Sequence, residues 1–258
     1  MKTVILCGGF GSRLSEETVV KPKPMVEIGG KPILWHILKT YHHYGYDDFV
    51  LALGYKGEVI KDFFINYYAM TSDVTVHLKS GKVDCANHSA EDITVTMVDT
   101  GRDSLTGGRL HRLENILRPK GTFMLTYGDG VADIDIRQLV KFHRQHGKIA
   151  TVTAVRPAAR FGRMIFDDDK VVDFKEKPQT DQGWINGGFF VFEPEVFNYL
   201  HGDSTVLEAD PLEKLAKDGQ LMAFKHTGFW QSMDTLRDRN YLESLWEVPN
   251  PPWKVWEK

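Results

Sequence analysis

Two kinds of apolar pattern alternate along the first 155 residues. Short continuous apolar runs are typical of buried strands, whereas apolar residues at helical spacing predict amphipathic helices. The expected strands cover 4–7, 49–53, 93–98, 122–126 and 149–155. The expected helices carry apolar stripes at 33–41, 59–67, 110–117 and 136–143. This alternation predicts an α/β fold with a largely parallel sheet, flanked by helices and joined by right-handed crossovers.

The pattern changes after residue 156. Short β-like runs at 164–166, 171–175 and 187–192 alternate with turns, and helical patterns follow at 211–217 and 235–246. No linker or repeat divides the chain, so we expect one domain over 1–258, with 1–155 and 156–258 as its two halves. The tail 249–258 is rich in Pro and Trp, and two expectations stay open for it: packing across a subunit surface, or a loose end.

Charge and cysteine content narrow the function. The 258 residues carry 32 Lys and Arg against 35 Asp and Glu, a net charge of −3, which argues against a nucleic-acid or anionic-membrane surface as partner. Phosphate chemistry would therefore depend on a few placed cations. Cys7 and Cys85 are too few for a disulfide framework and fit a reducing compartment. With no apolar run of membrane-spanning or signal length, the expectation is a cytoplasmic protein.

A glycine-rich loop, Gly8-Gly9-Phe10-Gly11-Ser12-Arg13-Leu14, follows the first expected strand. In open α/β sheets, ligands bind beyond the carboxyl ends of the strands, and glycines allow backbone N–H groups to approach a phosphate. The loop fits neither a dinucleotide fingerprint, which would need glycine at Leu14, nor a P-loop, which would need Gly-Lys-Ser/Thr. By itself the loop is weak evidence of function.

Two further features carry candidate chemistry. In Lys21-Pro22-Lys23-Pro24 the prolines favour an extended chain, which would aim the lysines rather than leave them on a helix surface. Solvated loop charges are the alternative. Asp129 lies between two glycines just after an expected strand, and Asp234 lies just before the last expected helix. Taken alone, each aspartate fits a plainer role, as a turn former or a helix N-cap.

Together these segments resemble the sugar-1-phosphate nucleotidyltransferases, over nearly the whole chain. The resemblance is carried by Gly8–Leu14, by Lys23-Pro24-Met25-Val26-Glu27, and by Lys31-Pro32. It implies a Rossmann-like nucleotidyltransferase fold, in which a nucleotide-binding half precedes a smaller β-rich sugar-binding part. It also implies that a sugar phosphate attacks the α-phosphorus of a nucleoside triphosphate in line and that pyrophosphate leaves.

The resemblance also assigns roles to individual residues. It implies that Lys23, and not Lys21, is catalytic, that Arg13 contacts the leaving phosphates, and that Asp129 and Asp234 hold Mg²⁺. Carboxylate and phosphate oxygens are ligands that Mg²⁺ prefers. The implied nucleotide-binding residues are Leu6, Cys7, Gly8, Gly9, Phe10, Gly11, Ser12, Ser104, Thr106, Gly108, Arg109 and Gly128. Gly130 departs from relatives that carry Asn or His there.

The sugar side and the base side are assigned in the same way. The resemblance implies that Glu176 accepts hydrogen bonds from sugar hydroxyls, that Lys177 neutralises the sugar phosphate, and that Asn186 and Gly187 face the sugar. An exposed Glu176–Lys177 ion pair is the alternative. The segment from Ser104 to Arg109 is expected to close over the base, with donors from Ser104, Thr106 and Arg109 and close approach of the Gly107-Gly108 backbone. Discrimination there would come from hydrogen-bond polarity.

Three strings resemble the members of this family that use CTP and glucose 1-phosphate. They are Thr-Gly-Gly-Arg-Leu, Tyr-Gly-Asp-Gly-Val-Ala-Asp and Phe-Trp-Gln-Ser-Met-Asp-Thr-Leu-Arg-Asp. This implies those two substrates and a homo-oligomer, a hexamer; the residues alone leave UTP or another nucleotide open. Two other classes remain: a non-catalytic sugar-nucleotide-binding protein, and a glycosyltransferase using Asp133-Ile134-Asp135 as an Asp-x-Asp motif.

Overall fold

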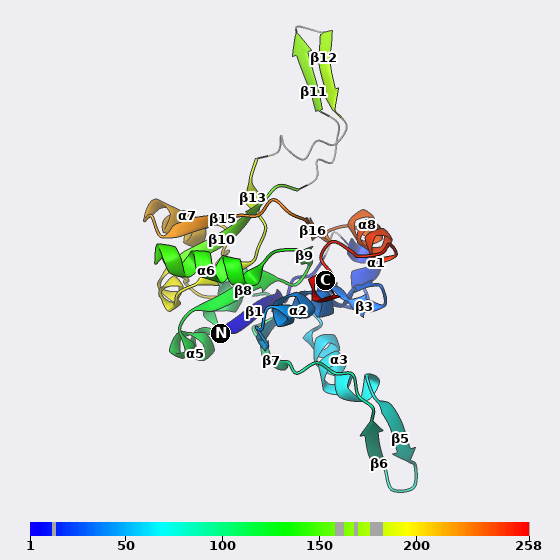
Figure 1. Cartoon of the computed structure of the whole chain (residues 1–258). Helices are drawn as coiled ribbons and strands as arrows, with labels where there is room; N and C mark the ends of the chain where they lie inside the picture. The colour runs from blue at the N-terminus through cyan, green and yellow to red at the C-terminus, as the bar shows by residue number, and fades with distance from the viewer. Residues whose placement is uncertain (12–13, 158–162, 168–169, 176–182, 258) are drawn as a thin grey trace.

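The core of the protein is a mixed, mostly parallel sheet (Figure 1). The computed structural model describes residues 1–11, 14–157, 163–167, 170–175 and 183–257. Among these, eight strands form the sheet in the order β13-β10-β14-β8-β1-β4-β7, with β15 paired to β10. The strands are β1 (Lys2–Cys7), β4 (Asp48–Leu53), β7 (Thr94–Asp99), β8 (Phe123–Tyr127), β10 (Ala150–Val155), β13 (Ile185–Asn186), β14 (Phe190–Phe192) and β15 (Leu221–Lys225).

The strands expected from the apolar runs in the first 155 residues are confirmed as β1, β4, β7, β8 and β10. The first four run parallel, so the loops that follow β1 and β8 leave the same edge of the sheet. β14 is antiparallel to β8 and to β10, and it joins the second half of the chain to the same sheet. The parallel register of β1 with β8, for example Leu6 against Tyr127, brings both loops to one site.

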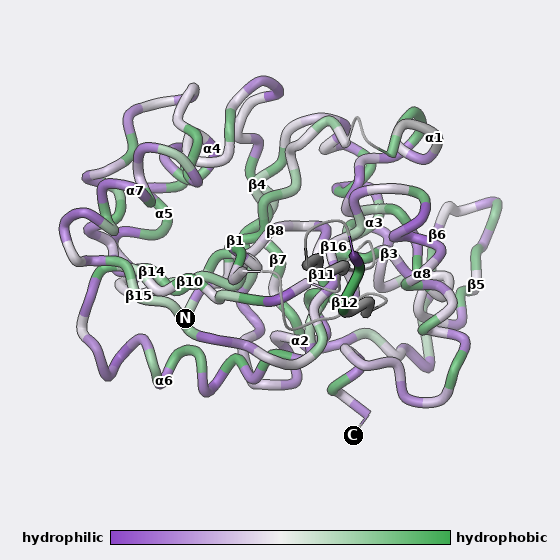
Figure 2. Tube along the Cα trace, turned by 90° about the horizontal axis from the view of Figure 1, so that it is seen from above, coloured by the Kyte–Doolittle hydropathy of each residue, from purple (hydrophilic) through white to green (hydrophobic). Residues whose placement is uncertain are grey.

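Helices cover both faces of the sheet. Alternate residues of one strand enter different cores: Ile5 and Cys7 of β1 pack with α2 and α6, whereas Val4 and Leu6 pack with α4, α5 and α7. Figure 2 shows α6 and α4–α5–α7 on opposite sides of the strands. Both faces are therefore buried, as the continuous apolar runs predict. The helices are α1 (Ser15–Thr18), α2 (Ile33–His43), α3 (Gly57–Met70), α4 (Thr106–His111), α5 (Glu114–Leu117), α6 (Ile136–His146), α7 (Asp210–Lys217) and α8 (Leu236–Trp246).

Smaller two-stranded elements complete the fold. Two are short pairs within the body of the protein, and two are hairpins that project from it (Figure 1). The pairs are β2 (Glu27–Ile28) with β3 (Lys31–Pro32), β9 (Gly130–Ala132) with β16 (Trp230–Ser232), β5 (Asp73–His77) with β6 (Lys82–Ala86), and β11 (Arg163–Asp167) with β12 (Lys170–Lys175). The β5–β6 hairpin was missed by the sequence analysis because it buries neither face, so it has no inside–outside pattern.

The C-terminal tail packs on its own chain, so the expectation of a loose end is wrong, whereas its packing across a subunit surface stays a prediction. The Trp253 side chain is fully buried, and its ring stacks on Phe229 at 5.6 Å between centroids. Its indole N–H donates to His36 Nδ1 at 3.3 Å, which attaches the tail to α2. No helix in the described part of the chain is long and apolar enough to cross a membrane.

Candidate active site

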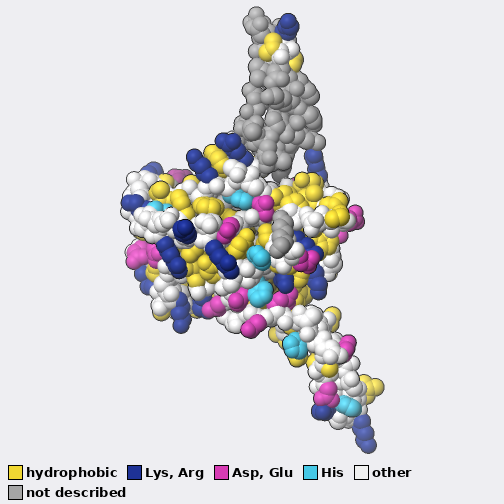
Figure 3. Space-filling view, viewed as in Figure 1, with side chains coloured by type: hydrophobic (Ala, Val, Ile, Leu, Met, Phe, Trp, Pro, Cys, Tyr) yellow, Lys and Arg dark blue, Asp and Glu magenta, His cyan; other side chains and the backbone are white. Residues whose placement is uncertain are grey.

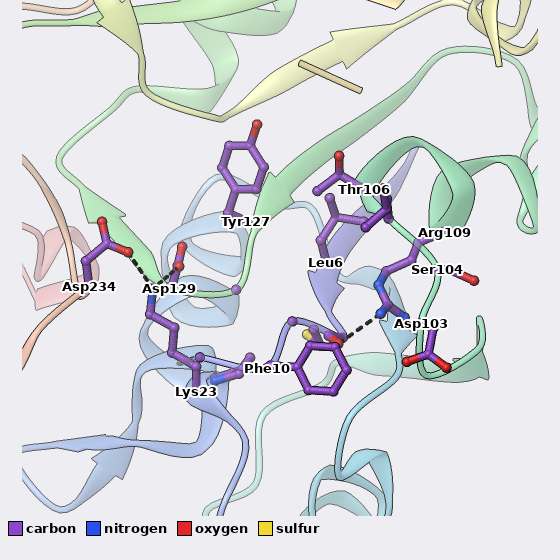
Figure 4. A pocket seen from close by; sticks show the side chains of 17 residues that line it. Leu6, Phe10, Lys23, Asp103, Ser104, Thr106, Arg109, Tyr127, Asp129 and Asp234 are labelled. Carbon is purple, nitrogen blue, oxygen red and sulfur yellow. Dashed lines mark hydrogen bonds and ion pairs between the residues drawn. The ribbon is translucent and has the colours of Figure 1, made fainter. Parts of the chain in front are cut away.

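A cleft of about 330 Å³ lies beyond the carboxyl ends of β1 and β8 (Figure 4). This is where open α/β sheets bind ligands. The residues that line it come from the glycine loop, the Lys23 segment, the start of α4, the end of β8 and the segment before α8. They are Leu6, Cys7, Gly8, Gly9, Phe10, Gly11, Lys23, Pro24, Asp103, Ser104, Leu105, Thr106, Arg109, Tyr127, Gly128, Asp129 and Asp234.

Lys23 lies between the two aspartates. Its Nζ donates to Asp129 Oδ2 at 2.5 Å and to Asp234 Oδ1 at 2.7 Å (Figure 4). Burial alone would lower the pKa of Lys23, but the charges and hydrogen bonds of the two carboxylates outweigh it and raise that pKa above its usual value. Lys21, by contrast, does not line the cleft, and pairs with Glu27 at 3.2 Å. Lys23 is thus the lysine of this segment that reaches the cleft.

The two aspartates are brought together by β9 and β16. These strands pair antiparallel, with Gly130 opposite Ser232, and the Met233 amide donates to the Asp129 carbonyl at 2.8 Å. Asp234 does not cap α8: Thr235 accepts from the Asp238 amide and Asp238 reciprocates in a capping box. The N-cap alternative for Asp234 is therefore wrong, and its carboxylate faces Lys23.

The segment that follows Lys23 is fixed by hydrogen bonds that involve α8 and the C-terminal tail. The Gly29 amide donates to both Glu243 carboxylate oxygens at 3.2 Å, and His36 Nε2 bonds the Ile28 carbonyl at 2.9 Å. An indole N–H can only donate, so His36 Nδ1 is the acceptor from Trp253 and the proton is on Nε2. The helix that begins just after Asp234 therefore also fixes the segment that carries Lys23.

The glycine loop approaches the cleft with its backbone. A Cβ on Gly128 would lie 2.8 Å from the Leu6 carbonyl oxygen, so β1 and the turn after β8 meet only because this residue is glycine. Gly8, Gly9, Phe10 and Gly11 line the cleft as expected from the resemblance. Ser12 and Arg13 lie outside the described residues, as do Glu176 and Lys177.

Arg109 lines the cleft but uses both terminal nitrogens for the protein backbone. Nη1 donates to the carbonyls of Leu53 and Gly101 at 3.1 and 2.6 Å, and Nη2 to that of Gly8 at 2.9 Å. A Cβ on Gly8 or Gly54 would lie within 2.1 and 2.3 Å of the guanidinium. Arg109 is thus a clamp that joins the glycine loop to the neighbouring loops, in addition to any contact with a base.

Gly107 and Gly108 do not approach the cleft, which corrects the expectation for the base side. A Cβ on Gly108 would lie 2.2 Å from the Asp203 carbonyl oxygen, and one on Gly107 would lie 2.6 Å from Thr205. Both glycines are needed because the 203–205 segment packs directly on α4. Ser104 and Thr106 do line the cleft, together with Asp103, which the sequence analysis did not single out.

Asn186 and Gly187, which were expected to face the sugar, are not among the residues that line the cleft. Asn186 Nδ2 donates to the Tyr127 hydroxyl at 3.1 Å, and a Cβ on Gly187 would lie 2.6 Å from Val155. Tyr127 itself lines the cleft and was missed because nothing in its local sequence distinguishes it from a buried strand residue. The Asp-x-Asp alternative is not supported, since Asp135 caps α6 through the Gln138 amide and Asp133 pairs with His226 at 3.0 Å.

The donor set around Lys23 fits a hard divalent cation. Asp129 and Asp234 already converge on one cation, the ammonium of Lys23. No cluster of three or more His, Cys, Asp or Glu in the described residues could hold a metal, so this part of the chain would supply two carboxylates at most. Mg²⁺ is commonly bound by one or two carboxylates together with phosphates and water, which matches this set.

Comparisons with known proteins show the family of the chain. The nucleotidyl transferase family model matches residues 2–247. Glucose-1-phosphate cytidylyltransferase of Salmonella typhi is 54% identical over 257 residues, covering 100% of both chains. The probable glucose-1-phosphate cytidylyltransferase of Bacillus subtilis is 44% identical, covering 99% of this chain and 100% of the relative.

The fold is also found in solved structures. A putative glucose-1-phosphate thymidylyltransferase from Bacillus anthracis, crystallised with sucrose, superimposes with a TM-score of 0.71 at 20% identity, over 97% of this chain and 96% of that one. At this identity the likeness supports the fold alone, and it agrees with the mostly parallel sheet. Family and fold together confirm the resemblance drawn from the glycine loop, the Lys23 segment and Lys31-Pro32. The chain belongs to the nucleotidyl transferase family and has its Rossmann-like α/β fold.

Proposed function

We propose that the protein transfers the cytidylyl group of CTP to glucose 1-phosphate, giving CDP-glucose and pyrophosphate. The observation that carries this proposal is the convergence of Lys23, Asp129 and Asp234 in a cleft that is also lined by glycines. The choice of substrates is supported by the full-length relatives, which are 54% and 44% identical and are named for this activity. The two halves of the chain would work as one domain.

The attacking group needs no general base. The second pKa of a phosphate monoester is about 6, so the sugar phosphate is already a dianion near neutral pH. The obstacle is repulsion between two anions: a pair of unit charges about 4 Å apart costs about 1 kcal/mol in water and about 4 kcal/mol at an effective dielectric of 20. Catalysis is then a matter of alignment and of placed positive charge.

Lys23 would supply that charge at the α-phosphate. Its raised pKa keeps the ammonium protonated, and Asp129 and Asp234 hold it in place before substrate binds. Asp129 and Asp234 would also hold Mg²⁺, which, when bound, would neutralise charge on the triphosphate. From the family resemblance, Arg13 would contact the leaving phosphates, Lys177 the sugar phosphate, and Glu176 the sugar hydroxyls.

The base would be read by the segment from Asp103 to Arg109. Cytosine and uracil have the same shape and differ in an amino group against a carbonyl, with the neighbouring ring nitrogen changing from acceptor to donor. Asp103, Ser104 and Thr106 supply polar groups at this wall of the cleft. Arg109 donates through both terminal nitrogens to the backbone, so we propose that it holds this wall of the cleft in one conformation. A mismatched base would then leave buried polar groups unpaired.

We also propose a cytoplasmic homo-oligomer, assembled through the arm formed by α3 and the β5–β6 hairpin. The side chain of Trp253 is not available for the contact, since it is buried in its own chain. The arm instead exposes apolar side chains, among them Met70 at 81% and Leu78 at 91% (Figure 3). Such a patch on a protein with net charge −3 fits a second copy of the chain better than nucleic acid or an anionic membrane. The hexamer is inferred from the resemblance.

Pyrophosphate release tests the proposed reaction. Protein, Mg²⁺, CTP and glucose 1-phosphate are incubated together and then with each component left out. We expect pyrophosphate and a product with the mass of CDP-glucose only in the complete mixture. Pyrophosphate released without the sugar phosphate would indicate a hydrolase, and binding of the product without turnover would indicate a sugar-nucleotide-binding protein. Either result would overturn the proposal.

A further inference from the structure

Glu208 joins the base side of the cleft to its sugar side, although it does not line the cleft. One carboxylate oxygen accepts from the Tyr127 hydroxyl at 2.5 Å, and the other accepts from the Thr106 hydroxyl at 2.6 Å. Tyr127 in turn accepts from Asn186 Nδ2 at 3.1 Å. A single side chain thus connects the first residue of α4, the last residue of β8 and the strand β13.

The donor and the acceptor of each hydrogen bond that joins Glu208, Thr106, Tyr127 and Asn186 can be assigned. The Tyr127 oxygen accepts from Asn186 Nδ2 at 3.1 Å, so its hydroxyl hydrogen is directed to Glu208. The Thr106 oxygen accepts from the Leu207 amide at 2.9 Å, which leaves its hydrogen for Glu208. Asn186 Oδ1 accepts from the Gly188 amide at 2.9 Å, so its NH₂ group must point at Tyr127. Both carboxylate oxygens of Glu208 therefore act as acceptors, one for each hydroxyl.

The segment that carries Glu208 also supports α4 directly. The Gly107 and Gly108 amides donate to the Thr205 carbonyl at 2.9 and 3.1 Å, and the Leu105 amide donates to that of Asp203 at 2.9 Å. The wall from Ser104 to Arg109 is therefore built against the 203–208 segment. Movement of that segment would displace groups on both sides of the cleft.

We propose that Glu208 is a positioning residue that holds the nucleotide side and the sugar side of the site in one hydrogen-bonded frame. The inference rests on the proposed function, because that function assigns Thr106 to the base and the region of Asn186 to the sugar. Glu208 touches neither substrate; it acts through Thr106 and Tyr127. Hydrogen bonds to charged groups are strong, and removal of one partner leaves the others buried and unpaired.

The test compares two isosteric variants whose glutamates bind side chains at opposite ends of β8. Glu208→Gln removes one acceptor from the frame. Glu193→Gln is the matched control, since Glu193 also accepts from a threonine hydroxyl, that of Thr122 at 2.9 Å, and from a second donor, His143, but at the far end of the strand. Steady-state kinetics with CTP and glucose 1-phosphate give kcat and both KM values, and thermal melts give the stability of each variant.

We expect Glu208→Gln to raise both KM values about tenfold, with kcat within about threefold, while Glu193→Gln lowers the melting temperature without moving either KM. Thr106→Val is a second test that leaves Glu208 unchanged. Thr106 lies on the base side, yet this substitution should also raise the KM for glucose 1-phosphate. Unchanged sugar-phosphate KM in both variants would overturn the inference. Absence of turnover in the parent would instead overturn the proposed function.

Discussion

The indole of Trp246 fills the space that a side chain on Gly29 would need. A Cβ there would lie 1.9 Å from the indole Nε1, and Gly29 has a φ of +59°. Gly29 follows the Lys23 segment, and Trp246 is the last residue of the helix that begins just after Asp234. The contact therefore links the far end of α8 to the segment whose lysine meets Asp234 at the near end.

Gly29→Ala should consequently impair both folding and turnover, and Gly30→Ala is its control. Gly30 has a φ of +71° but open space around it, so alanine there carries only the cost of the left-handed backbone, about 1 kcal/mol. Gly29→Ala adds the collision with Trp246, and we expect a further loss of 1–3 kcal/mol, roughly the cost of overpacking, and a lower kcat. Urea melts and kinetics on both variants measure this. Equal kcat in the two would show that Trp246 does not position Lys23.

Substitution of Lys23 should lower kcat far more than substitution of Lys21. Lys23→Ala removes the cation that Asp129 and Asp234 hold in the cleft, so kcat should fall by about two orders of magnitude or more, as for loss of one preorganised charge-stabilising group. Lys21→Ala breaks only a half-exposed pair with Glu27, and kcat should stay within about twofold. Steady-state kinetics at saturating substrate compare the two. A larger loss in Lys21→Ala would show that Lys23 is not the catalytic lysine.

Asp129→Asn and Asp234→Asn keep the shape of each side chain and remove its charge. If the two carboxylates share Mg²⁺, each variant should lose turnover by orders of magnitude, and the Mg²⁺ concentration for half-maximal activity should rise about 10-fold or more. Circular dichroism should remain that of the parent. Either variant with parental turnover at saturating Mg²⁺ would contradict the ligand assignment.

His36 should make the protein sensitive to acid. Burial lowers its pKa from 6.5 to about 4, so between these values the unfolded chain binds a proton that the folded chain does not. Stability therefore falls as the pH is lowered from 6.5 towards 4, by up to about 3 kcal/mol at 1.36 kcal/mol per pKa unit. His36→Gln removes this proton-binding group. Urea melts at pH 7.5 and 4.5 should show a smaller loss in the variant, and equal losses would contradict this role of His36.

The sheet could be predicted because its signals are local. Continuous apolar runs identified the strands buried on both faces, whereas the glycine loop and Lys23 became specific only through the family resemblance. The meeting of Asp129 and Asp234 followed from family resemblance, because 105 positions separate them along the chain and only the β9–β16 pairing joins them.

The remaining features depend on contacts between distant segments. Gly107 and Gly108 suggested close approach of a base, but their neighbour is the 203–205 segment, which no local pattern could reveal. Glu208 and Tyr127 gave no local signal for the same reason. The order of the tail could not be predicted because Trp253 packs on α2 and Phe229, both distant from it in sequence.

Competition between nucleotides tests the central claim most directly. The parent protein is given glucose 1-phosphate, Mg²⁺ and an equimolar mixture of CTP, UTP, GTP and dTTP, and the sugar nucleotides formed early in the reaction are quantified by mass spectrometry. Their ratios equal the ratios of kcat/KM. One unpaired hydrogen-bonding group costs about 1–3 kcal/mol, so CDP-glucose should exceed UDP-glucose by roughly 5- to 150-fold. Equal amounts, or an excess of any other nucleotide sugar, would contradict the assignment of CTP as the substrate.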